Sequence, residues 1–131
     1  MGKIILYLKL SASVIMSWLS YFLGGFDVLF ICLLTLVVID YISGVLSALC
    51  KKTLSSRTGF VGIIKKVCIF LVVAVATMFG IFTGLESIRD FTVSFYIANE
   101  SVSILENLGN IGVPLPQKLK DVLLQIREEK V

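Results

Sequence analysis

Polar side chains set inside long apolar stretches are the residues of this sequence best placed to do chemistry. Asp40 lies close to the middle of the apolar run 26–50, and Ser43, Gly44 and Ser47 follow it on nearly the same helical face. A carboxylate at that depth in a membrane costs at least a few kcal/mol unless it is partnered, hydrated or protonated. Asp40 is therefore a candidate functional residue. The alternative is a hydrogen-bonding anchor to another helix.

A second polar set lies in residues 91–113, which are about as long as one membrane-crossing helix. At about 100° per residue, this segment has one polar and one apolar face. The polar face holds Thr92, Tyr96, Asn99, Glu100, Ser103, Glu106, Asn107 and Asn110. In a chain this hydrophobic, the pattern predicts a helix that meets lipid on one side and partners or water on the other.

The residues for enzymatic chemistry are missing from the sequence. It contains no histidine, which is the commonest general base and transition-metal ligand. Its three cysteines, Cys32, Cys50 and Cys68, form neither a CxxC pair nor a zinc-binding spacing. We expect a non-enzymatic protein with no catalytic, cofactor-binding or metal-ligating residues. The net charge of +3 is too small to favour a nucleic-acid partner.

Composition indicates an integral membrane protein with a single domain, residues 1–131. The chain is 57% hydrophobic and 16% charged, whereas soluble domains average about 25% charged residues. Apolar runs and the polar-faced segment predict an all-α fold with about four membrane helices at 4–24, 26–50, 67–85 and 91–113. Residues 117–131, after Pro114 and Pro116, predict a short amphipathic helix on the membrane or on the protein.

Two sets of small residues are expected at helix contacts. Ser13 and Ser17 share a narrow stripe with Lys9 in the first run, which either packs on another helix, lines water or lies in the membrane plane. Ala76, Gly80 and Gly84 are spaced by four in the third run. They would bring two backbones close together, within one subunit or between subunits.

Basic residues between the second and third runs indicate the topology. Residues 51–66 read as a basic loop that contains no acid, and short basic loops stay in the cytoplasm. Both termini are then cytoplasmic too. The basic side chains, which would also suit anionic lipid head groups, are Lys51, Lys52, Arg57, Lys65 and Lys66.

With these segments in place, the chain resembles the toxin-secretion and phage-lysis holin family, which includes the clostridial toxin-export holin. The matching stretches are LVVIDYISGVLSA at 36–48, KKTLSSRTGFVGIIKK at 51–66 and FYIANESVSILENLGNIGVPLPQKLKDVL at 95–123. The resemblance implies a pore former that oligomerises in the bacterial inner membrane. Such a pore releases an endolysin, a wall-degrading enzyme, for host lysis, or exports a toxin.

The polar residues would then face a pore or another subunit. The candidates are Asp40, Ser43, Ser47, Tyr96, Asn99, Glu100, Ser103, Glu106, Asn107 and Asn110. In a single chain these polar faces must pack on one another, whereas in a ring they can border a shared water-filled lumen. Two other functions stay open: a small ion channel or transporter subunit, and a membrane scaffold that docks a partner protein.

Overall fold

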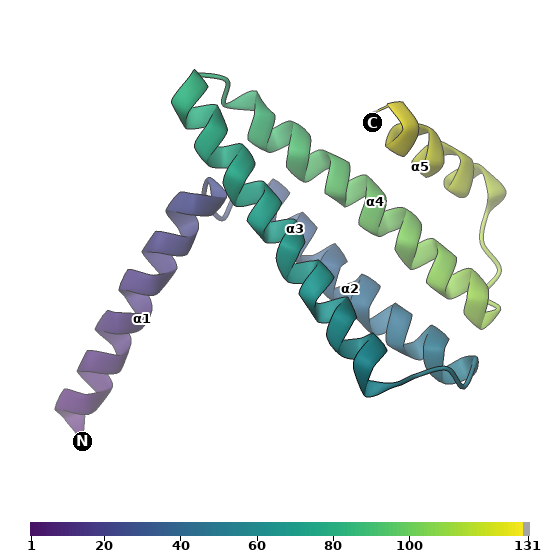
Figure 1. Cartoon of the computed structure of the whole chain (residues 1–131), viewed down its shortest axis with the longest axis horizontal. Coiled ribbons are helices and arrows are strands. Elements are labelled where there is room, and N and C mark those ends of the chain that lie inside the picture. The colour runs from purple at the N-terminus through teal and green to yellow at the C-terminus, as the bar shows by residue number, and fades with distance from the viewer. Residues whose placement is uncertain (130–131) are drawn as a thin grey trace.

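Residues 1–129 are described by the computed structural model, and they form five α-helices (Figure 1). The helices are α1 (Gly2–Leu23), α2 (Val28–Cys50), α3 (Ser56–Thr83), α4 (Ser87–Ile111) and α5 (Gln117–Glu129). The prediction of an all-α fold with a short C-terminal helix is therefore confirmed. The last two residues of the predicted tail lie outside the described residues.

The basic segment 51–66 differs from the loop that we expected. Only residues 51–55 connect the helices, because α3 begins at Ser56. Ser55 and Thr58 form a capping box, in which each side chain binds the backbone N–H of the other residue. This cap satisfies two N–H groups that the helix itself leaves free, and so starts the helix well before the apolar run at 67.

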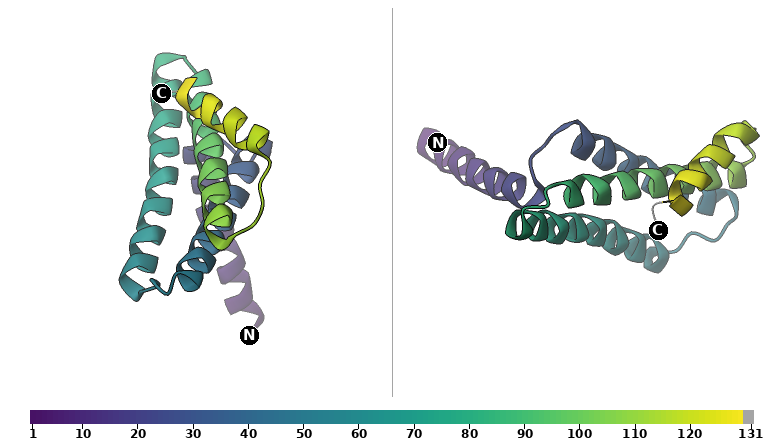
Figure 2. Two further views of the ribbon diagram at one scale, coloured as in Figure 1. Left: turned by 90° about the vertical axis from the view of Figure 1, so that its right-hand side faces the viewer. Right: turned by 90° about the horizontal axis from the view of Figure 1, so that it is seen from above.

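Helices α2, α3 and α4 form the bundle that contains the core (Figures 1 and 2). The core cluster consists of Leu33, Val37, Ile69, Val73 and Val93. Among the described residues, α1, α2 and α3 are long and apolar enough to cross a membrane, judged by length and composition alone. With 25 residues α4 is also long enough, but it carries more charged side chains.

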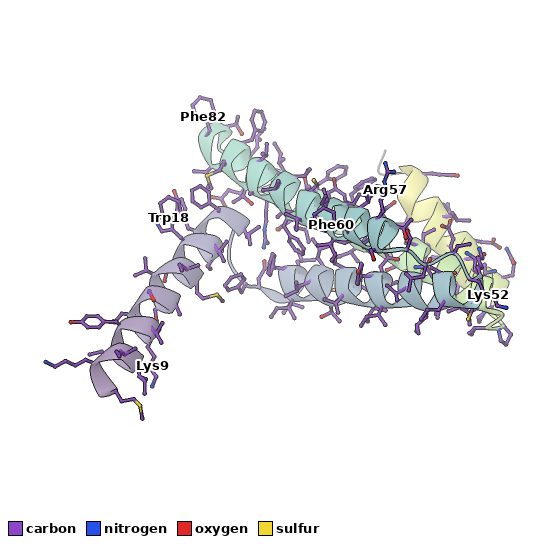
Figure 3. All side chains as sticks on the ribbon, turned by 60° about the horizontal axis from the view of Figure 1, so that its bottom comes forward. Lys9, Trp18, Lys52, Arg57, Phe60 and Phe82 are labelled. Carbon is purple, nitrogen blue, oxygen red and sulfur yellow. The ribbon has the colours of Figure 1, made fainter. Side chains whose placement is uncertain are left out.

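Most of the outer surface is apolar. Large hydrophobic side chains project outward from α1, α2 and α3 (Figure 3), and Phe60 and Phe82 are 64% and 88% exposed. A bundle whose polar groups are inside and whose apolar groups are outside suits a lipid surrounding rather than water.

The small-residue seam of α3 is used within the chain. Ala76 and Gly80 are buried, and a Cβ atom on Gly80 would lie 3.0 Å from the carbonyl oxygen of Leu85. The absence of a side chain at Gly80 therefore lets the α3–α4 turn pack closely against α3. Gly84 has a different role: it ends α3 in the left-handed conformation at φ 74° and is exposed.

Helix α1 projects away from the bundle, and none of its residues is buried (Figures 1 and 2). Arg89 of α4 ties its end to the bundle. The guanidinium donates hydrogen bonds to the carbonyl oxygens of Leu23 at 3.0 Å and Gly25 at 3.1 Å. It also binds both carboxylate oxygens of Asp27, at 2.6 and 3.0 Å. Gly24 is required at this crossing, because a Cβ there would lie 2.7 Å from the Arg89 Nε atom.

Helix α5 turns back after the segment 112–116 and packs along the C-terminal half of α4 (Figure 1). Of the two places expected for the amphipathic tail, the structure thus shows the one on the protein.

Replacing Arg89 by methionine should destabilise the protein. The carbonyls of Leu23 and Gly25 lose their donor, and an unsatisfied buried polar group costs about 1–3 kcal/mol. Chemical unfolding in detergent micelles would measure the loss. Arg57→Met removes an exposed arginine and should change stability by less than about 0.5 kcal/mol. Equal effects of the two substitutions would contradict the anchoring role.

Asp27 should make stability depend on pH in the acid range. Hydrogen bonds from Arg89 hold the pKa of Asp27 below its usual value, although partial desolvation acts in the opposite direction. A lowered pKa in the folded state gives stability that is fully present above the unfolded pKa of about 3.9 and is lost as pH falls through the folded value. Unfolding of wild type and Asp27→Asn should therefore differ at pH 6 and converge near pH 2. A constant difference across this range would contradict the assignment.

Candidate functional site: a buried polar cluster between three helices

Three helices each contribute a charged side chain to one point inside the bundle. Lys66 of α3 forms ion pairs with Asp40 of α2 and with Glu100 of α4, so that one ammonium group lies between two carboxylates. The three residues are far apart in the sequence but face the same interior. Each helix is therefore fixed in rotation and in height by its own charged group.

Asn107 of α4 extends this arrangement to the backbone of α2. Its side-chain amide donates hydrogen bonds to the Asp40 carboxylate at 2.9 Å, to the Asp40 carbonyl oxygen at 3.3 Å and to the Ser43 hydroxyl at 3.0 Å. The Ser43 hydroxyl in turn donates to the Asp40 carbonyl oxygen at 3.0 Å. We call Asp40, Ser43, Lys66, Glu100 and Asn107 the polar cluster.

The polar cluster is well shielded. Asp40 is 6% and Glu100 is 2% exposed, and 19% of the Lys66 side chain is accessible. In the described part of the chain, no buried side-chain nitrogen or oxygen lacks a hydrogen-bond partner. Removing charged groups from water is costly, and only close pairing with complete hydrogen bonding offsets that cost. The cluster holds one more acidic than basic group, so its balance depends on Lys66.

A cavity of about 270 Å³ opens onto the polar cluster from the end where α2 and α3 are joined. Gly44 and Gly62 line it, and their lack of a side chain leaves room beside the Tyr41 ring and the Asn107 amide. Its lining includes Asp40, Lys66, Ser103 and Asn107. Water molecules fit in a cavity of this size, so water can reach the polar cluster from one face of the bundle.

The structure brings some of the predicted residues together and places others elsewhere. Asp40, Ser43, Glu100 and Asn107 meet in the polar cluster, Ser103 borders its cavity, and Ser47 is buried on the same side of α2. Tyr96 packs against the hydrophobic core instead. Asn99 is half-buried, while Glu106 and Asn110 are exposed.

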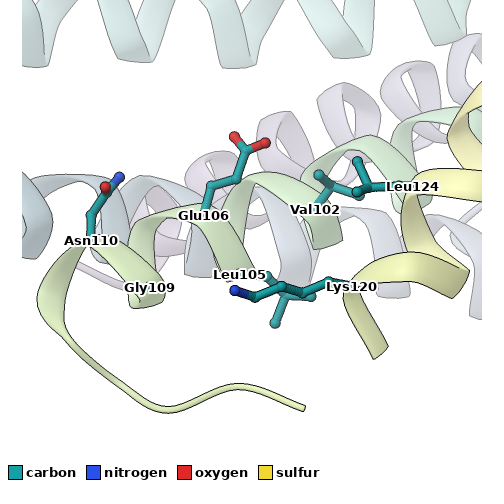
Figure 4. Close-up of a pocket in the computed structure, with 7 residues that line it drawn as sticks. All are labelled: Val102, Leu105, Glu106, Gly109, Asn110, Lys120 and Leu124. Atoms are coloured by element: carbon teal, nitrogen blue, oxygen red, sulfur yellow. The ribbon is translucent and has the colours of Figure 1, made fainter. Parts of the chain in front are cut away.

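Glu106 and Asn110 belong to a second cavity, of about 430 Å³, between α4 and α5 (Figure 4). Val102, Leu105 and Gly109 form its floor on α4, and Lys120 and Leu124 border it from α5. Lys120 makes no ion pair with Glu106 within the described residues. The polar face of α4 is therefore divided between an inner part and an outer part.

Sequence reasoning misplaced one residue and missed another. Lys66 was grouped with the topology residues, yet its ammonium group points inward, whereas Lys51, Lys52, Arg57 and Lys65 are exposed. Its spacing to the buried Ile69, Val73, Ala76 and Gly80 gives the signal, because these residues share one face of α3. That signal was hidden by treating 51–66 as a loop. The missed residue is Arg89, which the sequence pattern did not single out.

Replacing Lys66 by methionine should destabilise the protein by about 3–5 kcal/mol, because two buried carboxylates lose the cation that lies between them. Thermal unfolding in detergent micelles or proteoliposomes would measure this. Lys65→Met, at the exposed neighbouring position, is the matched control. Adding Asp40→Asn and Glu100→Gln to Lys66→Met should recover much of the loss. A Lys66→Met protein as stable as the Lys65→Met protein would show that the cluster contributes little.

Comparison with known proteins gives the family. The model of the bacteriophage holin family matches residues 17–128. A probable holin of Bacillus phage phi105 is 43% identical over 98 residues, which cover 74% of this chain and 73% of the phage protein. No solved structure matches the chain significantly.

Bacterial relatives align over more of the chain. An uncharacterized protein of Halalkalibacterium halodurans is 42% identical over 122 residues, covering 88% of this chain and 90% of its own length. An uncharacterized 14.9 kDa protein of Clostridium perfringens is 37% identical over 132 residues, covering 99% and 100%. The family match spans α2 to α4 and with them the whole polar cluster. The chain therefore belongs to the bacteriophage holin family, and it is a non-enzymatic, multi-pass membrane protein.

Proposed function

We propose that this protein accumulates in the bacterial cytoplasmic membrane in a closed form and then assembles into a pore through which an endolysin or a toxin leaves the cell. The family supports the general activity. The observation that carries the mechanism is the polar cluster, since a single chain hides the groups that a water-filled lumen would need.

The closed form follows from how the polar groups are paired. The carboxylates of Asp40 and Glu100 lie on the inside of the bundle, and the outer faces of α2 and α3 are apolar. Such a protomer presents hydrocarbon to lipid and can accumulate without harming the membrane. The basic residues Lys51, Lys52, Arg57 and Lys65 lie around the α2–α3 connection, which suits a cytoplasmic face in contact with anionic head groups.

Opening exposes the same groups to water. If α2 and α4 separate as subunits assemble, then Asp40, Ser43, Ser47, Glu100, Ser103 and Asn107 border a lumen. Hydration then replaces their pairing, so the desolvation cost of the closed form is removed. The half-buried Asn99 and the exposed Glu106 and Asn110 lie outside the polar cluster and remain available for contacts between subunits. Assembly depends on concentration by mass action, which provides a trigger without a ligand.

Controlled expression in a bacterium tests this function. Membrane potential and release of a co-expressed cytosolic wall hydrolase would be followed in time. Wild type should depolarise the membrane abruptly and release the hydrolase. Lys66→Met weakens the closed form and should open earlier at equal protein level. The triple variant Asp40→Asn, Glu100→Gln, Lys66→Met has a stable closed form but a poorly hydrated lumen, so it should open later or not at all.

Lys65→Met provides the control and should keep wild-type timing. Wild-type protein that accumulates in the membrane while potential and viability stay unchanged would overturn the pore proposal and favour the scaffold. Ion-selective depolarisation without hydrolase release would favour a small channel instead.

A further inference from the structure

Lys9 and Glu106 are two charged helical side chains that have no partner in the described part of the chain. Lys9 lies on α1, where every residue is accessible, and Glu106 lies on the outer side of α4. Neither forms an ion pair there. One is a cation and the other an anion, and a charge that faces hydrocarbon alone is costly.

The two charges lie at similar distances along their helices from one common point. Arg89 fixes a common reference, because its side chain binds the carbonyl of Leu23 at the end of α1. At 1.5 Å per residue, Lys9 is about 21 Å from Leu23 along α1, and Glu106 is about 26 Å from Arg89 along α4. Helix side chains lean toward the N-terminus. Helix α1 ends at the Arg89–Leu23 contact and α4 begins there. The side chain of Lys9 therefore leans away from this contact and that of Glu106 leans toward it, which reduces the difference between the two distances.

Within one chain the two residues are kept apart. Helix α1 diverges from the bundle, so its N-terminal half, with Lys9, lies far from the C-terminal half of α4 (Figures 1, 2 and 3). A second copy of the chain, however, can bring its bundle against this free helix.

We propose that α1 of one copy docks on α4 of the next copy, with Lys9 paired to Glu106 of its neighbour. This inference rests on the proposed function and names the contact that assembles the pore. Each copy uses two different surfaces, so the contact is heterologous and can continue from copy to copy into a closed ring. At this contact, α1 of one copy and α4 of the next copy run antiparallel.

The surfaces around the two charges fit this contact. Ser13 and Ser17 follow Lys9 on one face of α1, and their hydroxyls donate to the carbonyls of Lys9 and Ser13 in the same helix, at 2.9 and 2.8 Å. That face is therefore narrow, and its hydroxyl donors are satisfied, which favours close helix packing. On α4, Asn99 and Asn110 lie within about 40° of Glu106 around the helix and supply amides for the contact.

Lys120 is the competing partner for Glu106, since it borders the same cavity from α5 (Figure 4). The two are not paired in the described structure, so Glu106 is free for an incoming cation.

Disulfide cross-linking in membranes tests the contact without relying on lysis. The exposed Cys32, Cys50 and Cys68 are first replaced by alanine. Ser13→Cys is then placed in one tagged copy and Asn99→Cys in a second copy with another tag, because both lie about 15 Å from the Arg89–Leu23 reference. Oxidation should link the two tags. Ile15→Cys, on the opposite face of α1, is the matched control and should give little product.

Charge reversal decides whether the ion pair makes the contact. Lys9→Glu or Glu106→Lys alone should lower the cross-linked fraction about tenfold, and the two together should restore it to within about twofold of the starting yield. Lys120→Glu should leave the yield unchanged. Yields that ignore the reversals, no rescue in the double variant, or equal linking from Ile15→Cys would each overturn the proposal.

This experiment separates the two proposals. A charge-dependent cross-link in cells that neither depolarise nor lyse would support the interface and contradict the pore. Lysis by wild type together with a cross-link that does not respond to charge would support the pore and leave α1 covered by lipid, with Lys9 extended toward the head groups.

Discussion

The fold depends on the ammonium group of Lys66 between the carboxylates of Asp40 and Glu100. In water three such charges would interact weakly, but inside a helix bundle each carries a large desolvation cost. The cost is offset only while α2, α3 and α4 keep one rotation and one height. Asn107 adds a further constraint, because its amide joins the side chain and the backbone of Asp40. The polar cluster therefore specifies the packing of the bundle more than it adds to its stability.

This constraint also explains the surface. With the polar side chains of α2 and α4 turned inward, the outside of the bundle is left to large hydrophobic residues. Arg89 plays a related part at the other end, where it satisfies the carbonyls that the α1–α2 turn leaves free. Helix α1 is thus held at its end alone, and its length remains available to lipid or to another protein. The division between a fixed bundle and a free helix follows from where the buried charges are.

The proposed pore makes opposite demands on the same residues, because the protein must be harmless while it accumulates and must later admit water. A buried cluster with complete pairing meets the first demand, and its high polarity meets the second once the helices separate. An entirely apolar bundle of this shape would pack as well but would have nothing to line a pore. The single cation among two acids makes the closed form sensitive to any change that reaches Lys66. Polarity held inside an apolar shell is therefore consistent with the proposed pore.

By itself, the sequence determined the membrane class, the five helices and the family, because composition, periodicity and motifs are local properties. It also identified Asp40, Glu100 and Asn107 as unusual, since polar groups stand out in apolar runs. Only the tertiary structure decided their partners: Lys66 is 26 residues from Asp40 and 34 from Glu100. The tertiary structure likewise showed that Ala76 and Gly80 are buried inside the single subunit and that Arg89 anchors the end of α1. Such contacts join residues far apart in the chain, and no local pattern records which helix faces which.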